Sequence, residues 1–228
     1  MISWFFKYGA AFFVFNTIFL SINATVELGN IIFLTLMSFF GIILLINPKL
    51  IREVLFHKAF GFFLFINIIN VCYFILFHSF DDAMAVKYLL ARGVQFSIIA
   101  ISIYLHYDYY SKRFFDHLVS LILFVIFLGI FFDPNLFAGR YSGIIWNPNM
   151  LSSFTVIAFS VLLIKTRDYS IYILCVLLLL FVVSLATGSR GTLIGFVLAF
   201  LMKYGFSRAN IFYGFISVLF YMFLINID

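Results

Sequence analysis

Long apolar runs follow one another along almost the whole chain, and polar residues are confined to short stretches between them. A helix that crosses a bilayer needs roughly 20 mostly apolar residues, because the backbone must satisfy its own hydrogen bonds in lipid. The runs are continuously apolar and do not alternate with a period of two, which excludes a transmembrane barrel of strands. The sequence therefore predicts an all-α, polytopic helical bundle that is integral to a membrane.

We predict a single transmembrane domain over residues 1–228, with about nine spans at 8–24, 29–46, 59–77, 83–105, 114–132, 150–164, 169–185, 191–204 and 211–227. Composition supports this prediction, since 65% of the 228 residues are hydrophobic and the mean hydropathy is +1.18. A net charge of +5 would also suit nucleic acid, but the basic residues form short clusters between apolar runs. That distribution is typical of loops beside anionic cytoplasmic lipid. We expect contact with membrane lipid and no nucleic-acid partner.

The placement of lysine and arginine predicts the orientation of the spans. With a cytoplasmic N-terminus, every cytoplasmic connection is basic, and these connections hold Lys7, Lys49, Arg52, Lys58, Lys112, Arg113, Lys165, Arg167, Lys203 and Arg208. The remaining four of the 14 basic residues fall on the outer side and need a separate reason: Lys87, Arg92, Arg140 and Arg190.

Arg140 lies in a polar loop that leads through Gly143 into Asn147-Pro148-Asn149. Asparagine at the N-cap and proline in the first turn are common at helix starts, so a structural interpretation of Asn147 and Pro148 is at least as strong as a functional one. It does not explain Arg140. This side chain either reaches out to water or clamps an anion, because a guanidinium matches phosphate oxygens and a helix N-terminus adds partial positive charge.

A second polar motif, Thr187-Gly188-Ser189-Arg190-Gly191, is predicted to be an outward turn between two spans. Its glycines permit tight backbone geometry. Its amides and Ser189 are able to bind an oxyanion while Arg190 supplies charge. The alternative is a plain turn with an arginine that reaches water, and two such motifs close in sequence make that alternative less attractive.

Arg92 lies about 13 Å below the predicted outer end of its helix, which is too deep for an ordinary loop charge. Gln95 shares its helix face. Two explanations stay open: an ion pair with an outer carboxylate, Asp81 or Asp82, or contact with a ligand. Lys87 is nearer the surface and is expected to reach water.

Candidate acid–base groups are few. His57, His106 and His117 fall in the predicted cytoplasmic loops, and His78 is the histidine on the outer side. The spans hold almost no acidic residues, which disfavours a proton pump or an ion-coupled transporter. We see no metal-ligand spacing and no nucleotide-binding glycine loop, so we predict neither a metal nor another cofactor, and no catalytic residue is assigned.

Between Arg140 and Tyr204 the sequence resembles the O-antigen ligase and O-antigen polymerase family of bacterial envelope proteins. Two motifs carry the resemblance in the order that the family has them. The first is Arg140-x-x-Gly143 leading into Asn147-Pro148-Asn149 at the start of a span, and the second is Thr187-Gly188-Ser189-Arg190-Gly191 opening a later span.

The resemblance implies a glycosyltransferase of lipopolysaccharide biosynthesis in the bacterial inner (cytoplasmic) membrane. It would move a glycan from a polyprenyl pyrophosphate carrier, such as undecaprenyl pyrophosphate, to a sugar hydroxyl of an acceptor glycan or glycolipid on the outer face. Arg140, Arg190 and Arg92, with Ser189, would bind the pyrophosphate, since its charge grows as it leaves. The motif's structural residues would be Gly143, Asn147, Pro148, Asn149, Gly188 and Gly191.

In this family the base for the acceptor hydroxyl is assigned to a histidine in a large external loop beyond these motifs. We expect the chain to emerge outside at Asn226–Asp228, where family members continue into that loop, and so to be a truncated or split form that does not catalyse transfer by itself. The competing hypothesis is a transporter or binding protein for a lipid-linked anion, with no reaction following.

Overall fold

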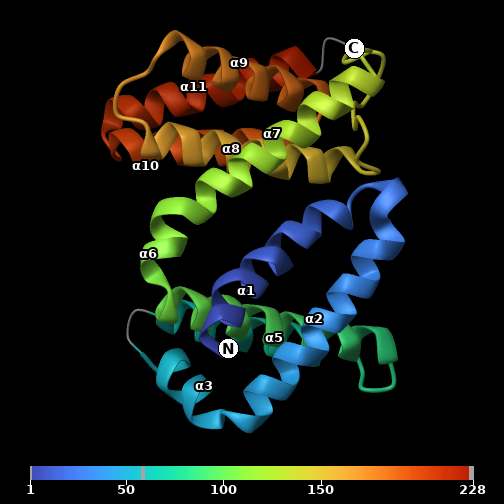
Figure 1. The fold of residues 1–228 in the computed structure, drawn as a ribbon. Helices are drawn as coiled ribbons and strands as arrows, with labels where there is room; N and C mark the ends of the chain where they lie inside the picture. The colour runs from blue at the N-terminus through green and yellow to red at the C-terminus, as the bar shows by residue number, and fades with distance from the viewer. Residues whose placement is uncertain (1, 58–59, 226–228) are drawn as a thin grey trace. The chain divides into compact units, whose positions relative to one another are not determined.

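The computed structural model of the chain describes residues 2–57 and 60–225. Lys58 and the predicted outward end at Asn226–Asp228 lie outside these residues. Figure 1 shows helices in every range that was predicted to be a span, which confirms the all-α class. The long helices are α1 (Ile2–Phe19), α2 (Val26–Ile46), α4 (Gly61–Phe77), α5 (Ala83–Leu105), α7 (Phe115–Phe132), α8 (Pro148–Lys165), α9 (Ile171–Ala186), α10 (Arg190–Tyr204) and α11 (Arg208–Ile225).

Short helical segments join some of the long ones. They are the 3-10 turn η1 (Asn23–Thr25), α3 (Pro48–Leu55), α6 (Tyr107–Tyr109) and the π-helical turn η3 (Tyr110–Phe114). The predicted boundaries of the first span need correction, because α1 begins at Ile2 and ends at Phe19 rather than running from Tyr8 to Ala24. The reason lies in the next residues, where Ile22 forms an isolated β-bridge with Ile145 and η1 follows.

Three described helical stretches are long and apolar enough to cross a membrane: Asn23–Ile46, Tyr107–Phe132 and Pro148–Lys165. Shorter apolar helices include Gly61–Phe77, Leu89–Leu105, Ile171–Ala186 and Gly191–Tyr204. Many large apolar side chains point away from the protein, as at Leu45 and Ile171, which are 82% and 81% exposed. Such a surface suits lipid rather than water. These are features of a membrane protein, while nine spans and a cytoplasmic N-terminus stay predictions.

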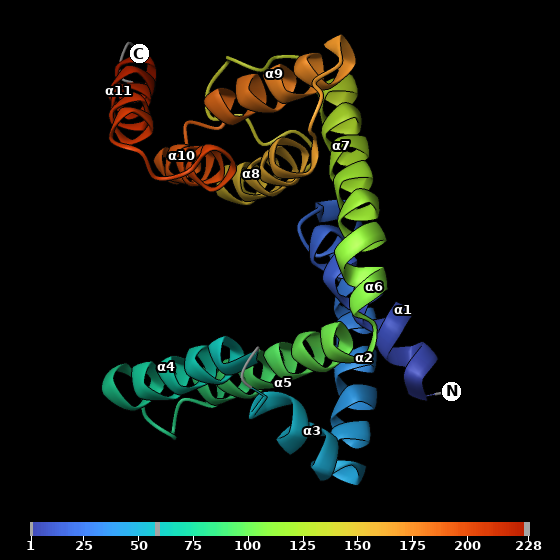
Figure 2. The ribbon, with the colours of Figure 1, turned by 90° about the vertical axis from the view of Figure 1, so that its left-hand side faces the viewer.

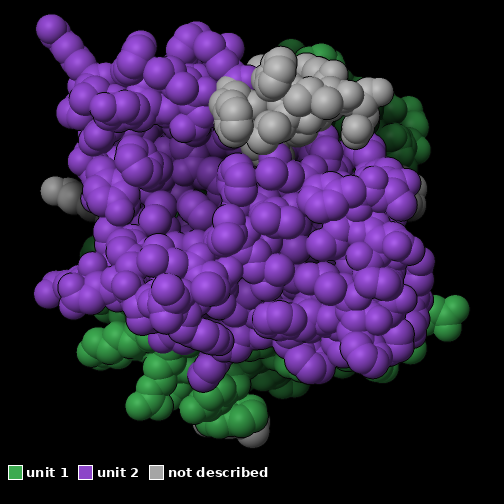
Figure 3. All heavy atoms as spheres, turned by 90° about the horizontal axis from the view of Figure 1, so that it is seen from above, with its two compact units in different colours: residues 1–20, 26–114 green, residues 21–25, 115–228 purple. Residues whose placement is uncertain are grey.

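The chain forms two compact units, coloured separately in Figure 3. The first unit comprises Met1–Leu20 and Val26–Phe114, and the second comprises Ser21–Thr25 and Phe115–Asp228. In the first unit, Phe6 of α1 and Phe40 of α2 are fully buried with ring centroids 5.6 Å apart. The side chain of Asn16 also ties α1 to α2 by donating to the Gly29 carbonyl at 2.8 Å.

In the second unit, α8 lies against both α9 and α10, with short connections between consecutive helices (Figure 2). The polar groups gather at two opposite ends. At one end, Lys165 forms a salt bridge of 2.6 Å with Asp116, and Lys203 donates to the carbonyl of Thr166. We call this the lysine end. The other end holds the loop 133–147 and the turn 187–189, and we call it the arginine end.

Candidate functional site

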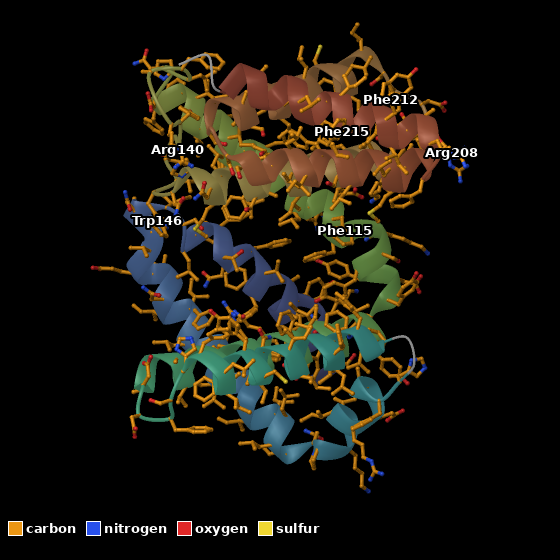
Figure 4. The ribbon with its side chains drawn as sticks, turned by 180° about the vertical axis from the view of Figure 1, so that it is seen from behind. Phe115, Arg140, Trp146, Arg208, Phe212 and Phe215 are labelled. Carbon is orange, nitrogen blue, oxygen red and sulfur yellow. The ribbon has the colours of Figure 1, made fainter. Side chains whose placement is uncertain are left out.

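The two motifs of the sequence meet at the arginine end. The Tyr141 N–H group donates to the Ala186 carbonyl at 2.8 Å, and the Arg140 Nε–H group donates to the Thr187 carbonyl at 3.2 Å. The loop before α8 is thereby attached to the turn between α9 and α10. Figure 4 labels Arg140 and Trp146 at this end of the second unit and Arg208 at the opposite end.

The guanidinium of Arg140 is held by two neutral acceptors. Besides the bond to Thr187, its Nη2 donates to Asn149 Oδ1 at 2.7 Å. Arginine carries five N–H donors, so these two bonds leave three for another partner. Among the described residues no carboxylate forms a salt bridge with Arg140, and its side chain is exposed. A fixed, uncompensated cation with spare donors is suited to binding an anion.

The motif Asn147-Pro148-Asn149 both starts a helix and contacts Arg140. Asn147 is the N-cap of α8, since its Oδ1 accepts from the Asn149 N–H at 2.8 Å, and Pro148 occupies the first turn. The structural interpretation of these two residues is therefore confirmed. The side chain of Asn149 points elsewhere and accepts from Arg140, so the same short motif both starts the helix and orients the guanidinium.

The turn at Thr187 depends on glycine. Gly188 has a φ of +62°, and a Cβ added there would lie 3.6 Å from Arg140 Cγ, so the arginine stem lies over the turn. Thr187 is fully buried, with its hydroxyl donating to the Ser184 carbonyl at 2.7 Å and accepting from the Ser189 N–H at 3.3 Å. The predicted need for tight glycine geometry is confirmed at Gly188.

Ser189, Arg190 and Gly191 form the start of α10. Ser189 occupies the N-cap position, but its side chain does not cap the helix. Arg190 is the first helical residue, and its side chain lies outside what the structure describes, so the meeting of the two guanidinium groups stays a prediction. A Cβ at Gly191 would meet open space. The next residue, Thr192, is 1% exposed, and its hydroxyl has no hydrogen-bond partner among the described residues.

Tyr141 was not singled out by sequence reasoning, although it follows Arg140 directly. It is 5% exposed, and its hydroxyl donates to the Asp133 carbonyl at 3.1 Å, which closes the loop upon itself. Burial raises the pKa of the phenol, and the Asp133 charge raises it further. Gly143, with φ of +57°, leaves room for this ring, because a Cβ there would lie 3.1 Å from the Tyr141 hydroxyl.

The sequence alone also did not indicate a second set of contacts that holds the loop before α8. The segment Ser21–Thr25 belongs to the second unit, where the Ser21 carbonyl accepts from the Trp146 N–H at 3.0 Å and Ile22 pairs with Ile145. These contacts fix the loop just before the N-cap of α8. No local sequence pattern signals them, because their partners lie more than a hundred positions apart.

Arg92 belongs to the first unit, where it lines a cleft with residues of α4 and α5. It forms no salt bridge with Asp81 or Asp82, and the Asp82 carboxylate lies instead 3.7 Å from His78 Nδ1. The ion-pair explanation for Arg92 therefore finds no support among the described side chains. That Arg92 shares one site with Arg140 stays a prediction, and the side chain of Lys87 lies outside the described ones.

Comparison of the chain with protein-family models, with curated proteins and with solved structures finds no match. The resemblance to the O-antigen ligase and polymerase family thus rests on the two motifs alone.

Proposed function

We propose that the arginine end binds the pyrophosphate of a polyprenyl-linked glycan, and that the protein acts as an O-antigen ligase-like or polymerase-like glycosyltransferase of the bacterial inner membrane. One observation carries the proposal. Arg140 is fixed against the Thr187–Gly188 turn by two neutral acceptors, so its charge is not cancelled and three of its donors remain. The family resemblance supplies the identity of the anion.

In such a transfer, an acceptor hydroxyl oxygen bonds to the anomeric carbon of the glycan while the bond from that carbon to the phosphate oxygen breaks. The pyrophosphate leaves with additional negative charge. A cation held in place before the reaction stabilises that charge with little reorganisation. Arg140 would serve here, with Arg190 and Ser189 at the start of α10 as the predicted partners. The hydroxyl proton goes to a base that these motifs do not contain.

The second unit also offers space for an apolar chain. A cavity of about 270 Å³ lies among α8, α9, α10 and α11, and it is lined by Phe159, Leu163, Phe181, Leu193, Phe196, Val197, Phe200, Tyr213, Gly214 and Ser217. A polyprenyl carrier joins a charged group to a long apolar tail. The arginine end and this cavity share α8 and α10, so one pair of helices would contact both parts of such a ligand.

The opposite ends of the second unit support the proposed orientation. At the lysine end, Lys165 and Lys203 are satisfied by a carboxylate and by main-chain carbonyls. At the arginine end, Arg140 keeps spare donors. With the basic connections on the cytoplasmic side, the arginine end would face outward, where the family acts.

A second function is favoured by one observation. Residues 133–149 and 184–192 contain no histidine, and Asp133 is their one carboxylate. A protein that binds or moves a lipid-linked anion needs the cation but no base. Its arginine end would then hold the pyrophosphate without transfer.

Both functions are tested with membranes that contain the full chain, a polyprenyl pyrophosphate-linked glycan and an acceptor. Binding of the carrier and appearance of the joined product are measured separately. We expect Arg140→Ala to weaken carrier binding by about 10- to 100-fold, because charge-assisted contacts are lost. Arg208→Ala, an arginine change at the opposite end, is the control. Binding without product favours the second function, and unchanged binding in Arg140→Ala refutes both.

A further inference from the structure

A cleft that contains several polar groups lies between α4 and α5 within the first unit. Its volume is about 320 Å³, and it is lined by Asn70, Tyr73, Phe74, His78, Ala85, Leu89 and Arg92. Only residues of the first unit form it, so its binding can be measured separately from that of the arginine end.

Arg92 gives the cleft an uncompensated positive charge. It forms no salt bridge or hydrogen bond with any side chain that the structure describes, and its own side chain is exposed. The carboxylate closest along the chain is accounted for, since Asp82 lies 3.7 Å from His78 and accepts from the Ala85 N–H at 3.0 Å. A charged arginine in an apolar membrane helix has a high free-energy cost unless a partner compensates its charge.

The other polar groups of the cleft are able to donate hydrogen bonds. Asn70 Nδ2 is buried, and the described residues offer it no acceptor, whereas Asn67, one turn earlier on α4, donates to the Phe63 carbonyl at 2.8 Å. Tyr73 and His78 line the same cleft with groups that donate readily. A buried amide donor without an acceptor is unfavourable, so a ligand that supplies an acceptor would be stabilised there.

We propose that this cleft binds a phosphate group, with Arg92 and Asn70 as its main donors. Phosphate oxygens accept several hydrogen bonds at once and match the guanidinium fork. The same chemistry is carried by the headgroup of an anionic phospholipid and by soluble phosphate. Large apolar side chains on α4 are exposed near the cleft, with Leu76 at 74% and Phe77 at 67%, so a lipid tail would find a suitable surface beside it.

The test uses the full chain purified in neutral detergent and titrated by calorimetry with inorganic phosphate, dihexanoyl phosphatidic acid and dihexanoyl phosphatidylcholine. We expect saturable binding of at least one of the first two probes. Arg92→Gln and the nearly isosteric Asn70→Asp should each weaken it by about tenfold or more, through loss of the cation and through repulsion. Arg52→Gln, an exposed arginine of α3 in the same unit, should stay within about twofold.

Competition identifies the source of the phosphate. Displacement of phosphatidic acid by inorganic phosphate at similar concentration assigns soluble phosphate, and resistance to displacement assigns the lipid headgroup. Circular dichroism verifies that each variant is folded, and Asn70→Asp decides by itself if Arg92→Gln does not fold. Wild-type affinity in both variants, tighter binding of phosphatidylcholine than of phosphatidic acid, or no binding of either phosphate probe would overturn the proposal.

Discussion

The Nε–H group of Arg140 donates to the main-chain carbonyl of Thr187 at 3.2 Å, although 47 positions separate the two residues. A main-chain acceptor cannot be removed by a side-chain substitution, and it carries no charge to cancel that of the guanidinium. The direction of Arg140 is therefore fixed by the fold of the turn, while its charge remains available.

Asn147 and Asn149 should separate stability from binding. Asn147→Ala removes the cap of α8 and should lower the free energy of unfolding by about 0.5–2 kcal/mol. Asn149→Ala leaves that cap in place but removes an acceptor of Arg140, so it should weaken carrier binding with a smaller effect on stability. Thermal unfolding and carrier titration of both variants measure the two effects. Equal losses of stability and binding in both variants would contradict the division of roles.

Gly188 and Gly191 form a matched pair within one turn. Gly188→Ala places a side chain at φ of +62° and should destabilise the protein by about 1 kcal/mol. Gly191 lies in α10 with open space at its Cβ position, so Gly191→Ala should be neutral or slightly stabilising. Midpoints of thermal unfolding compare the two. A midpoint that falls more for Gly191→Ala than for Gly188→Ala would contradict the positive φ at Gly188.

The orientation is tested by labelling single cysteines from outside the cell. In a background with Cys72 and Cys175 replaced, Ala138→Cys should react with an impermeant reagent, because it lies near Arg140 on the predicted outer side. Ser111→Cys, beside Lys112, should react only after the membrane is opened. Labelling of Ser111→Cys in intact cells would reverse the orientation.

Ionisation of Tyr141 should lower the stability of the folded protein at alkaline pH. Its pKa is raised by burial and by the Asp133 charge, so the folded protein favours the neutral phenol. The stabilising contribution is then fully present below the unfolded pKa of about 10 and is lost as the pH rises through the folded pKa. The stability difference between wild type and Tyr141→Phe should therefore shrink above about pH 10. A difference that is constant up to pH about 11 would contradict the buried phenol.

The helices were predictable from the sequence, because hydropathy in this chain is a local property. The apolar runs gave each long helix, and the pair Asn147-Pro148 marked the start of α8 correctly. The π-helical turn Tyr110–Phe114 was not predicted, since no residue type specifies it. The predicted end of the first helix was wrong, since α1 ends at Phe19 and Ile22 pairs with Ile145 far along the chain.

The sequence predicted that the two motifs of the candidate site would meet, but not the contacts that join them. Arg140 was predicted to converge with Arg190 on one anion site; the structure places Arg140 over the turn at Gly188, which precedes Arg190. The hydrogen bond from Arg140 to Asn149 and the one from the Tyr141 hydroxyl to the Asp133 carbonyl were not predicted, because both depend on side-chain directions. The residues around Arg92 could not be predicted from the sequence either, since Asn70 and Tyr73 belong to another helix.

The pairing of Ser21 and Ile22 with Ile145 and Trp146 also sets an order of events during synthesis. A ribosome adds about 5–20 residues per second, so the partners of this early segment appear about 6–25 s after it. Until then the contacts of Ser21 and Ile22 with Ile145 and Trp146 cannot form. The loop that presents Arg140 can therefore be completed only late in biogenesis, by rejoining a part of the chain that entered the membrane first.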